Sequence, residues 1–146
     1  MIIAFAGHSL VGNEIDVEKR LTKELSKLID KNHNLEFYLG CYGGFDLLAV
    51  RCCRKLKENY ESIKLSFITP YMDKNYLKRA ENRFDEIIYP ELETVPKKFA
   101  IIKRNEWIAK NCDLLICFVD YGWGGAFRTY SYAKKLNKKI INLGRL

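Results

Sequence analysis

Five short apolar runs, separated by longer amphipathic stretches, constrain the fold of this chain more than any other feature. The runs cover residues 2–6, 35–39, 65–69, 114–119 and 140–143. Each is nearly continuous in apolar residues, which indicates strands covered on both faces, as in a parallel sheet with helices on each side. The pattern predicts an α/β fold: a single Rossmann-like three-layer domain over residues 1–146, with about five mainly parallel strands.

The amphipathic stretches predict the helices between these strands. The first is expected to begin near Asn13, a good capping residue, and the second at Asp46. A further helix is expected over residues 98–111, with Asn105 inside its buried row and Arg104 on the flank of that row. A buried amide needs hydrogen-bond partners, so Asn105 is expected to bind either a loop or a ligand.

Residues 71–97 interrupt the rhythm of strands and helices. The segment is rich in charged residues and tyrosines and is bounded by Pro70 and Pro96. A short helix over 76–84 and an extended stretch over 87–96 are expected. An insertion of this length beyond a strand end suits a lid, one wall of a pocket, a subunit interface or a cover over the sheet edge, and the sequence leaves these open.

Composition narrows the class of protein. With 48% hydrophobic and 29% charged residues, the chain has the composition of an ordinary globular protein. Its five cysteines are odd in number and lie mostly inside expected elements, which favours reduced, buried thiols and a cytoplasmic location. With only His8 and His33 as histidines, no metal site is expected. Residues 1–6 lack a basic leader and predict a strand rather than a signal peptide, and no run suits a membrane span.

The net charge of +7, from 25 Lys and Arg against 18 Asp and Glu, raises the question of a nucleic-acid partner. The lysines are spread through every expected helix, as they are on solvated faces. This distribution predicts that nucleic acid is not the partner. The basic surface is expected instead to attract a phosphorylated small molecule.

Two glycine pairs stand at strand-to-helix junctions: Gly43-Gly44, and Gly124-Gly125 followed by Ala126. Glycine lets a ligand approach the backbone closely, and the free N–H groups that open a helix favour an anion. Both turns are therefore interpreted as phosphate cradles. The alternative for Gly40, Gly43 and Gly44 is that they only make turns.

The usual strand order of such a sheet, third-second-first-fourth-fifth, places both glycine pairs at the crevice where ligands bind. The candidate ligand-binding residues follow expected strand ends or belong to the helices nearby: Gly7, His8, Ser9, Gly40, Tyr42, Gly43, Gly44, Asp46, Pro70, Tyr71, Arg104, Asn105, Tyr121, Gly124, Gly125, Ala126 and Thr129.

These side chains suit the parts of a nucleotide. Tyr42, Tyr121 or Trp123 could stack on a base, and Asp46, Asn105 or Thr129 could bind hydroxyl groups. His8 directly follows the first strand, where it serves a ligand or caps a helix.

Four segments resemble the YpsA-like branch of the SLOG superfamily: IIAFAGH, FYLGCYGGFDLLA, VPKKFAIIKRNEWIAKNCDLLICFV, and the GGA turn with YAKK. The resemblance covers essentially the whole chain. It implies a Rossmann-like domain related to the LOG phosphoribohydrolases, also called lysine decarboxylase-like proteins, and similar to nucleoside deoxyribosyltransferases. It further implies binding of nucleotides or NAD-derived signals, including in bacterial and phage conflict systems, and assembly into homodimers.

The same resemblance bears on catalysis. LOG enzymes carry PGGxGTxxE at the second glycine turn and use its glutamate, whereas this chain reads GGAFRTYSYAKK. The expected carboxylate is missing, so a binding protein for a nucleotide or an ADP-ribose-like ligand, with no required cofactor, is the leading hypothesis. The alternatives are a nucleotide N-glycosidase that uses Asp46 and His8, which needs a well-placed carboxylate, and a nucleic-acid or protein interaction domain.

Overall fold

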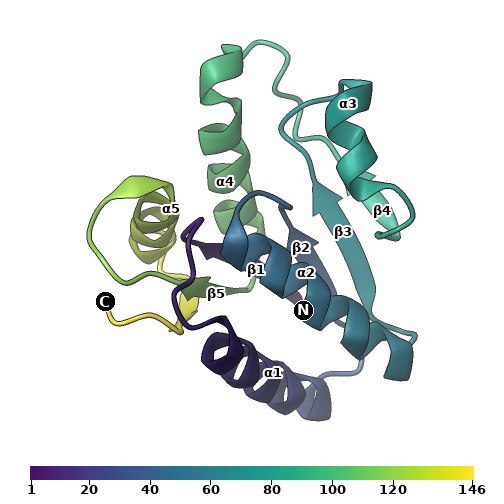
Figure 1. The fold of residues 1–146 in the computed structure, drawn as a ribbon. Coiled ribbons are helices and arrows are strands. Elements are labelled where there is room, and N and C mark those ends of the chain that lie inside the picture. Colours follow the sequence, from purple (N-terminus) through teal and green to yellow (C-terminus); the bar gives the residue numbers. More distant parts are fainter.

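The computed structural model describes residues 1–146 except for the side chain of Arg79. In this part of the chain, six strands form one parallel sheet in the order β4-β3-β2-β1-β5-β6 (Figure 1). The strands are β1 (Ile2–Gly7), β2 (Glu36–Leu39), β3 (Lys64–Ile68), β4 (Glu86–Ile88), β5 (Leu114–Phe118) and β6 (Lys139–Asn142).

Helices cover both faces of the sheet, as Figure 1 shows. One face carries α1 (Glu14–Lys31) and α2 (Gly44–Asn59), and the other carries α4 (Ala100–Asn111) and α5 (Gly124–Lys135). The expected cap of the first helix is confirmed, because the Asn13 side chain accepts a hydrogen bond from the Asp16 N–H at 3.3 Å.

Burial on both faces explains the nearly continuous apolar runs. Ile3 and Phe5 of β1 pack toward α1 and α2, while Ala4 and Ala6 pack toward α4 and α5. All five residues of β5 are buried in the same alternating way. The Rossmann-like three-layer fold and the expected strand order are therefore confirmed.

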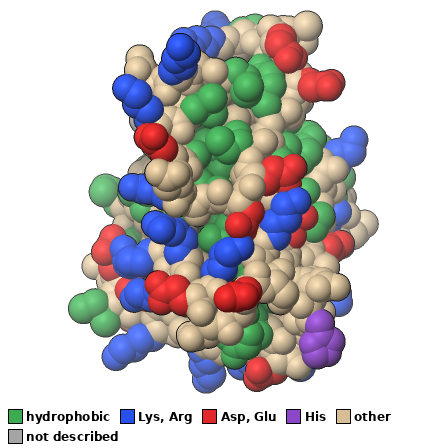
Figure 2. Space-filling view, turned by 90° about the vertical axis from the view of Figure 1, so that its right-hand side faces the viewer, with side chains coloured by type: hydrophobic (Ala, Val, Ile, Leu, Met, Phe, Trp, Pro, Cys, Tyr) green, Lys and Arg blue, Asp and Glu red, His purple; other side chains and the backbone are tan. Residues whose placement is uncertain are grey.

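The number of strands differs from the expected five, because β4 adds an edge strand inside the 71–97 segment. Its residues are exposed or half-buried, and an edge strand of this kind needs no continuous apolar run. Glu86 of β4 forms an ion pair with Lys64 of β3 at 2.6 Å. Charges of this kind blunt a sheet edge against pairing with another chain, and Figure 2 shows both signs of charge side by side across this side of the molecule.

The helix expected over 76–84 is shorter in the structure. It consists of α3 (Lys74–Leu77) continued by a 3-10 turn, η1 (Lys78–Ala80). A second 3-10 turn, η2 (Lys97–Phe99), leads into α4. The segment thus supplies an edge strand and one short helical piece on the α1 and α2 face.

The phase of α4 also differs from expectation. Arg104 is 1% exposed, whereas Asn105 is only half-buried and Ile101 is not in the core. The buried row runs through Ala100, Arg104 and Ile108, which is one residue earlier than the row anchored on Ile101. One residue corresponds to about 100° of rotation, enough to exchange the two side chains.

The cysteines are buried, as the sequence predicted. Burial raises the pKa of the Cys112 thiol to about 11 and that of Cys117 to about 12, so both stay protonated. None of the described helices is long and apolar enough to cross a membrane. Within the same residues, no three His, Cys, Asp or Glu side chains gather where they could hold a metal ion.

Candidate functional site

A small hollow lies at the carboxyl edge of the sheet, between β1, β2, α4 and α5. Its volume is about 110 Å³. The residues around it are Phe5, Ala6, Gly7, Gly40, Tyr42, Asp46, Ile101, Arg104, Asn105, Ile108, Gly125, Ala126 and Thr129. Pockets for drug-sized ligands occupy roughly 300 to 1,000 Å³, so this hollow suits one small group rather than a whole nucleotide.

The Gly43-Gly44 turn at the start of α2 is filled by the chain itself. The Gly44 N–H donates to the Ser9 carbonyl at 2.8 Å, and the Phe45 N–H donates to the His8 carbonyl at 3.3 Å. A Cβ on Gly44 would lie 2.5 Å from the Ser9 oxygen. Gly43 and Gly44 are required for close packing against the loop after β1, and the Gly44 and Phe45 N–H groups are taken by that loop rather than free for a phosphate.

Asp46 supplies the negative charge at this end of α2. Its carboxylate accepts the Tyr42 N–H at 3.1 Å. The side chain keeps some solvent contact, yet it is surrounded mostly by protein atoms. Burial raises its pKa to about 6, against the opposing effects of the Arg104 charge and the Tyr42 N–H. The α2 terminus therefore carries its own internal anion.

Arg104 forms the floor of the hollow. Its Nη1 donates to the Ile68 carbonyl at 2.8 Å and its Nε to the Asn105 Oδ1 at 2.9 Å. A Cβ on Gly40 would lie 3.0 Å from Nη1, so glycine is needed for this close approach. Among the described residues, no acceptor lies on the Arg104 Nη2, which leaves a buried charge with unused donor capacity beside the hollow.

The start of α5 is open, in contrast to that of α2. Gly124 has φ of +90°, which favours glycine, but a Cβ on Gly125 would meet nothing within 4 Å. Trp123 at the N-cap gives no side-chain hydrogen bond, and the first turn contains no acidic residue. In the described part of the chain, no acceptor meets the N–H groups of residues 124–126. The helix thus presents free donors and a partial positive charge to solvent.

Three aromatic rings stack in a row beside this helix start. The His8 and Tyr121 rings are 3.9 Å apart and nearly parallel, at 7°. The Tyr121 and Trp123 rings follow at 4.2 Å and 29°. Trp123 is 68% exposed, so the stack ends in a ring that faces solvent. We call His8, Tyr121 and Trp123 the ring stack.

His8 has a structural role at the inner end of the ring stack. It is buried, and its Nε2 accepts the Asp120 N–H at 2.9 Å. Burial lowers its pKa, and the nearby Asp120 carboxylate only partly opposes this effect, so the ring is neutral at pH 7. His8 does not line the hollow that contains Asp46, so the structure does not bring this proposed catalytic pair together.

The structure gathers part of the predicted site and separates the rest. The predicted residues that line the hollow are Gly7, Gly40, Tyr42, Asp46, Arg104, Asn105, Gly125, Ala126 and Thr129. The Thr129 hydroxyl is used within α5, since it donates to the Gly125 carbonyl at 3.0 Å. Pro70 and Tyr71 lie outside the hollow, and the Tyr71 hydroxyl donates to the Lys97 carbonyl at 3.1 Å.

Sequence reasoning missed Arg128 as a site residue. It is exposed on the first turns of α5 and lines a shallow depression with Asn105 and Gly125. Its position four residues after Gly124 is a sequence signal, because residues that far apart lie on the same face of a helix. Arg128 therefore adds an exposed positive charge beside the open start of α5.

Comparisons with known proteins support the fold. No family model matches the chain. The uncharacterized SPbeta prophage-derived protein YoqJ of Bacillus subtilis (strain 168) is 26% identical over 140 residues, which are 83% of this chain and 82% of YoqJ.

Two solved structures of DNA processing protein A (DprA) share the fold. The Streptococcus pneumoniae protein has a TM-score of 0.68 and 17% identity, over 96% of this chain and 49% of that one. The Helicobacter pylori protein, described by its single-stranded DNA binding mode, has the same TM-score and identity, over 100% of this chain and 66% of that one. This chain thus spans about half to two thirds of those proteins. At 17% identity, the likeness to these structures shows a shared fold.

These findings correct two expectations from the sequence. The expectation of a nucleotide or NAD-derived ligand is wrong, because the structural neighbours are DNA processing proteins, and the hollow of about 110 Å³ is small for such a ligand. Setting nucleic acid aside as a partner was wrong for the same reason. The even spread of lysines along the sequence does not exclude a nucleic-acid partner. A binding surface can also be formed by aromatic rings and helix starts that come together only in the folded chain.

Proposed function

We propose that this chain binds single-stranded DNA across the carboxyl edge of its sheet. The observation that carries the proposal is the exposed Trp123 ring, which ends the ring stack directly beside the open start of α5. Proteins that bind single strands combine aromatic platforms for bases with positive charge for phosphates. This edge of the molecule offers both within a few residues of chain.

The outer face of Trp123 is the proposed platform for a base. A base that stacks there extends a row of rings already anchored in the core by the buried His8. The anchoring holds the platform in place before binding, which limits the loss of side-chain freedom. Tyr42, which is 49% exposed on the other side of the hollow, offers a second ring.

The hollow between α4 and α5 is the proposed site for a backbone phosphate. Gly125, Ala126 and Arg104 line the hollow, and Arg128 lines the shallow depression that shares Asn105, Gly125 and Thr129 with it. A phosphate there receives donors from a helix start and charge from arginine. A hollow of about 110 Å³ admits a phosphate group and leaves the sugar and base outside, on the platform.

The proposal is tested by fluorescence anisotropy with labelled oligo(dT) at several salt concentrations. Trp123→Ala should weaken binding about 5- to 150-fold, because one base stack contributes about 1 to 3 kcal/mol. Tyr60→Ala is the matched control, since Tyr60 is 44% exposed and lies at the other end of α2. Equal affinities for both variants would contradict the proposal.

Salt and competitors separate strand binding from small-ligand binding. The logarithm of the affinity should fall with the logarithm of salt concentration by about 0.7 for each phosphate contacted in a single strand. AMP, NAD and ADP-ribose should compete poorly at equal phosphate concentration, since each of these small molecules can occupy only part of the carboxyl edge of the sheet. Displacement by one of these molecules at micromolar concentration would count against a strand as the ligand.

We also propose a relationship to the YpsA-like branch of the SLOG superfamily, because four segments of the sequence resemble its motifs. We further propose a cytoplasmic location, because free, buried cysteines suit a reducing compartment. The expected homo-oligomer stays a prediction.

A further inference from the structure

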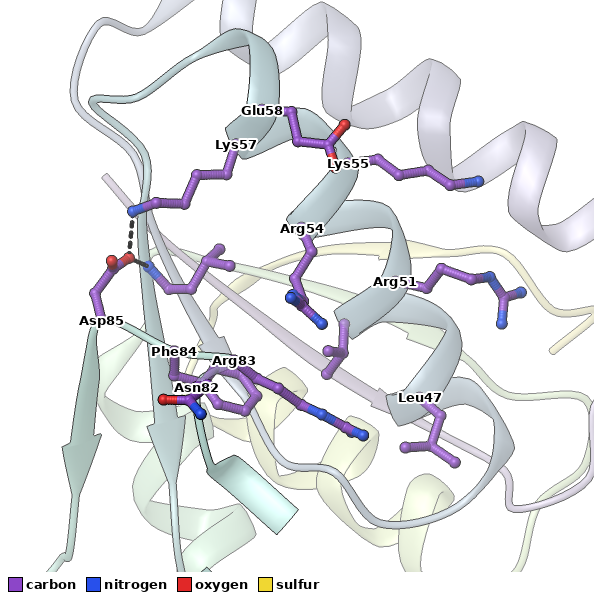
Figure 3. A pocket seen from close by; sticks show the side chains of 12 residues that line it. Leu47, Arg51, Arg54, Lys55, Lys57, Glu58, Asn82, Arg83, Phe84 and Asp85 are labelled. Atoms are coloured by element: carbon purple, nitrogen blue, oxygen red, sulfur yellow. Dashed lines mark hydrogen bonds and ion pairs between the residues drawn. The ribbon is translucent and has the colours of Figure 1, made fainter. Parts of the chain in front are cut away.

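A long open groove runs beside α2, between this helix and the segment that precedes β4 (Figure 3). Its volume is about 710 Å³. One wall is α2 from Leu47 to Glu58, and the other is the segment 82–85 before β4. The groove exists because only the short α3 and η1 follow β3 in this layer, where a full helix would cover the sheet beside α2.

The groove is basic on both walls. The cationic residues that line it are Arg51, Arg54, Lys55, Lys57 and Arg83, against the carboxylates of Glu58 and Asp85. Lys57 pairs with Asp85 at 2.5 Å, while Arg51 and Lys55 share Glu18 at 3.2 and 3.5 Å.

Arg54 and Arg83 stand apart from these ion pairs. Among the described residues, neither has a carboxylate within ion-pair distance. Figure 3 shows Arg54 pointing from α2 into the groove and Arg83 extending from the segment 82–85 toward the end of α2 that carries Leu47. Two guanidinium groups without carboxylate partners on opposite walls of one groove favour an anion placed between them.

The floor of the groove is apolar and partly aromatic. Val50 and Leu65 lie beneath it with Phe84, whose ring stacks on Phe67 of the core at 5.3 Å. Leu47, 48% exposed, stands at the end of the groove nearest the start of α2. Val50 and Leu65 are almost fully buried, so the half-buried Phe84 is the main apolar contact that this floor offers a base between the cationic walls.

We propose that this groove is a second binding site for single-stranded DNA, with backbone phosphates between Arg54 and Arg83. The proposal rests on the proposed function. The α2 wall is about 16 Å long at 1.5 Å per residue, and it begins one turn from Gly44 at the carboxyl edge. A strand that leaves the edge near Tyr42 therefore has a basic path along α2. A groove with charges repeated along its length matches a polymer with one charge per unit better than a compact ligand.

The test compares short and long strands on the full chain. Oligo(dT) of about 6 nucleotides should occupy the edge alone, and oligo(dT) of about 20 nucleotides should reach the groove as well. In the double variant Arg54→Gln/Arg83→Gln, affinity for the long strand should fall about tenfold and its salt slope by about 1.4. Affinity for the short strand should stay within about twofold of wild type.

A control double variant, Lys23→Gln/Lys139→Gln, removes the same charge from exposed lysines outside the groove. It should bind both strands as wild type does. Equal loss in the two double variants, or no loss in the groove variant, overturns the second site while the edge site stands. If wild type binds neither strand, the proposed function fails as well. If the groove variant loses binding of poly-glutamate and keeps the long strand, the groove takes an acidic peptide and the proposal is wrong.

Discussion

The two glycine turns of this chain stand at the same edge of the sheet and serve opposite purposes. At Gly43-Gly44 the loop after β1 fills the space, its carbonyls take the N–H groups of Gly44 and Phe45, and Asp46 supplies the charge. At Gly124-Gly125 the space is open, the described residues provide no acceptor, and the first turn has no acid. A glycine pair at a strand-to-helix turn therefore indicates a ligand only where the chain does not satisfy the turn itself.

The sharpest test of this difference is to add one methyl group at each turn. Gly44→Ala should lower the free energy of unfolding by about 3 kcal/mol, because the new Cβ would meet the Ser9 oxygen. Gly125→Ala should change it by less than about 0.5 kcal/mol, since its Cβ would enter open space. Urea unfolding of both variants provides the measurement. Similar costs at the two positions would remove the distinction between a filled and an open turn.

The internal anion of the filled turn should appear in the pH dependence of stability. The pKa of Asp46 is raised from 3.8 to about 6, so the folded chain binds a proton that the unfolded chain has released between those values. Wild type should therefore lose stability relative to Asp46→Asn as the pH rises from about 4 to 6, by at most about 3 kcal/mol.

The measurement is the difference between the unfolding free energies of wild type and Asp46→Asn at several pH values. Taking this difference cancels the titration of carboxylates that both chains share, such as Glu18 and Asp85. A difference that is constant with pH, or one that moves in the other direction, would show that burial does not dominate at Asp46.

A substitution in the open turn, Gly124-Gly125, should change the affinity for oligo(dT) rather than the free energy of unfolding. Gly125→Ala should weaken oligo(dT) binding about fivefold to tenfold, because the methyl group separates a phosphate from the N–H groups of α5. Gly12→Ala is the matched control, since its Cβ would also meet nothing within 4 Å and Gly12 lies outside the hollow. Anisotropy titrations on both variants would refute the phosphate site if Gly125→Ala bound like the control.

The smallest effect is expected from the exposed cation beside the open turn. Arg128→Gln should weaken oligo(dT) binding about twofold to fourfold at low salt and reduce the salt slope by about 0.7, as for the loss of one phosphate contact. Lys135→Gln, at the other end of α5, removes the same charge and should leave the slope unchanged. A change of slope in both variants would indicate attraction by net charge alone.

The sequence predicted the elements and their order well, because buried parallel strands produce apolar runs that need no tertiary information. It missed β4, since a short edge strand with exposed residues has no such run. It misplaced Arg104 and Asn105, because the phase of α4 depends on packing over Gly40 and on the Ile68 carbonyl.

The candidate site was harder to predict for a related reason. Both glycine pairs look alike in sequence, and only the position of Ser9 shows that one turn is filled. Arg54 and Arg83 line the same groove only because the segment 82–85 folds back beside α2, with the short α3 and η1 between it and β3. The roles of these residues depend on contacts between segments that are distant in the sequence, and local sequence patterns do not predict such contacts.

The most direct test of strand binding at the carboxyl edge is the fluorescence of Trp123 itself. The chain has two tryptophans, and Trp107→Phe leaves Trp123 as the sole one while keeping a ring against Tyr38. Addition of unlabelled oligo(dT) to this variant should quench its fluorescence, with a midpoint that matches the affinity from anisotropy, because a base stacks on the exposed ring. Binding by anisotropy with unchanged Trp123 fluorescence would contradict the account and place the strand elsewhere on the molecule.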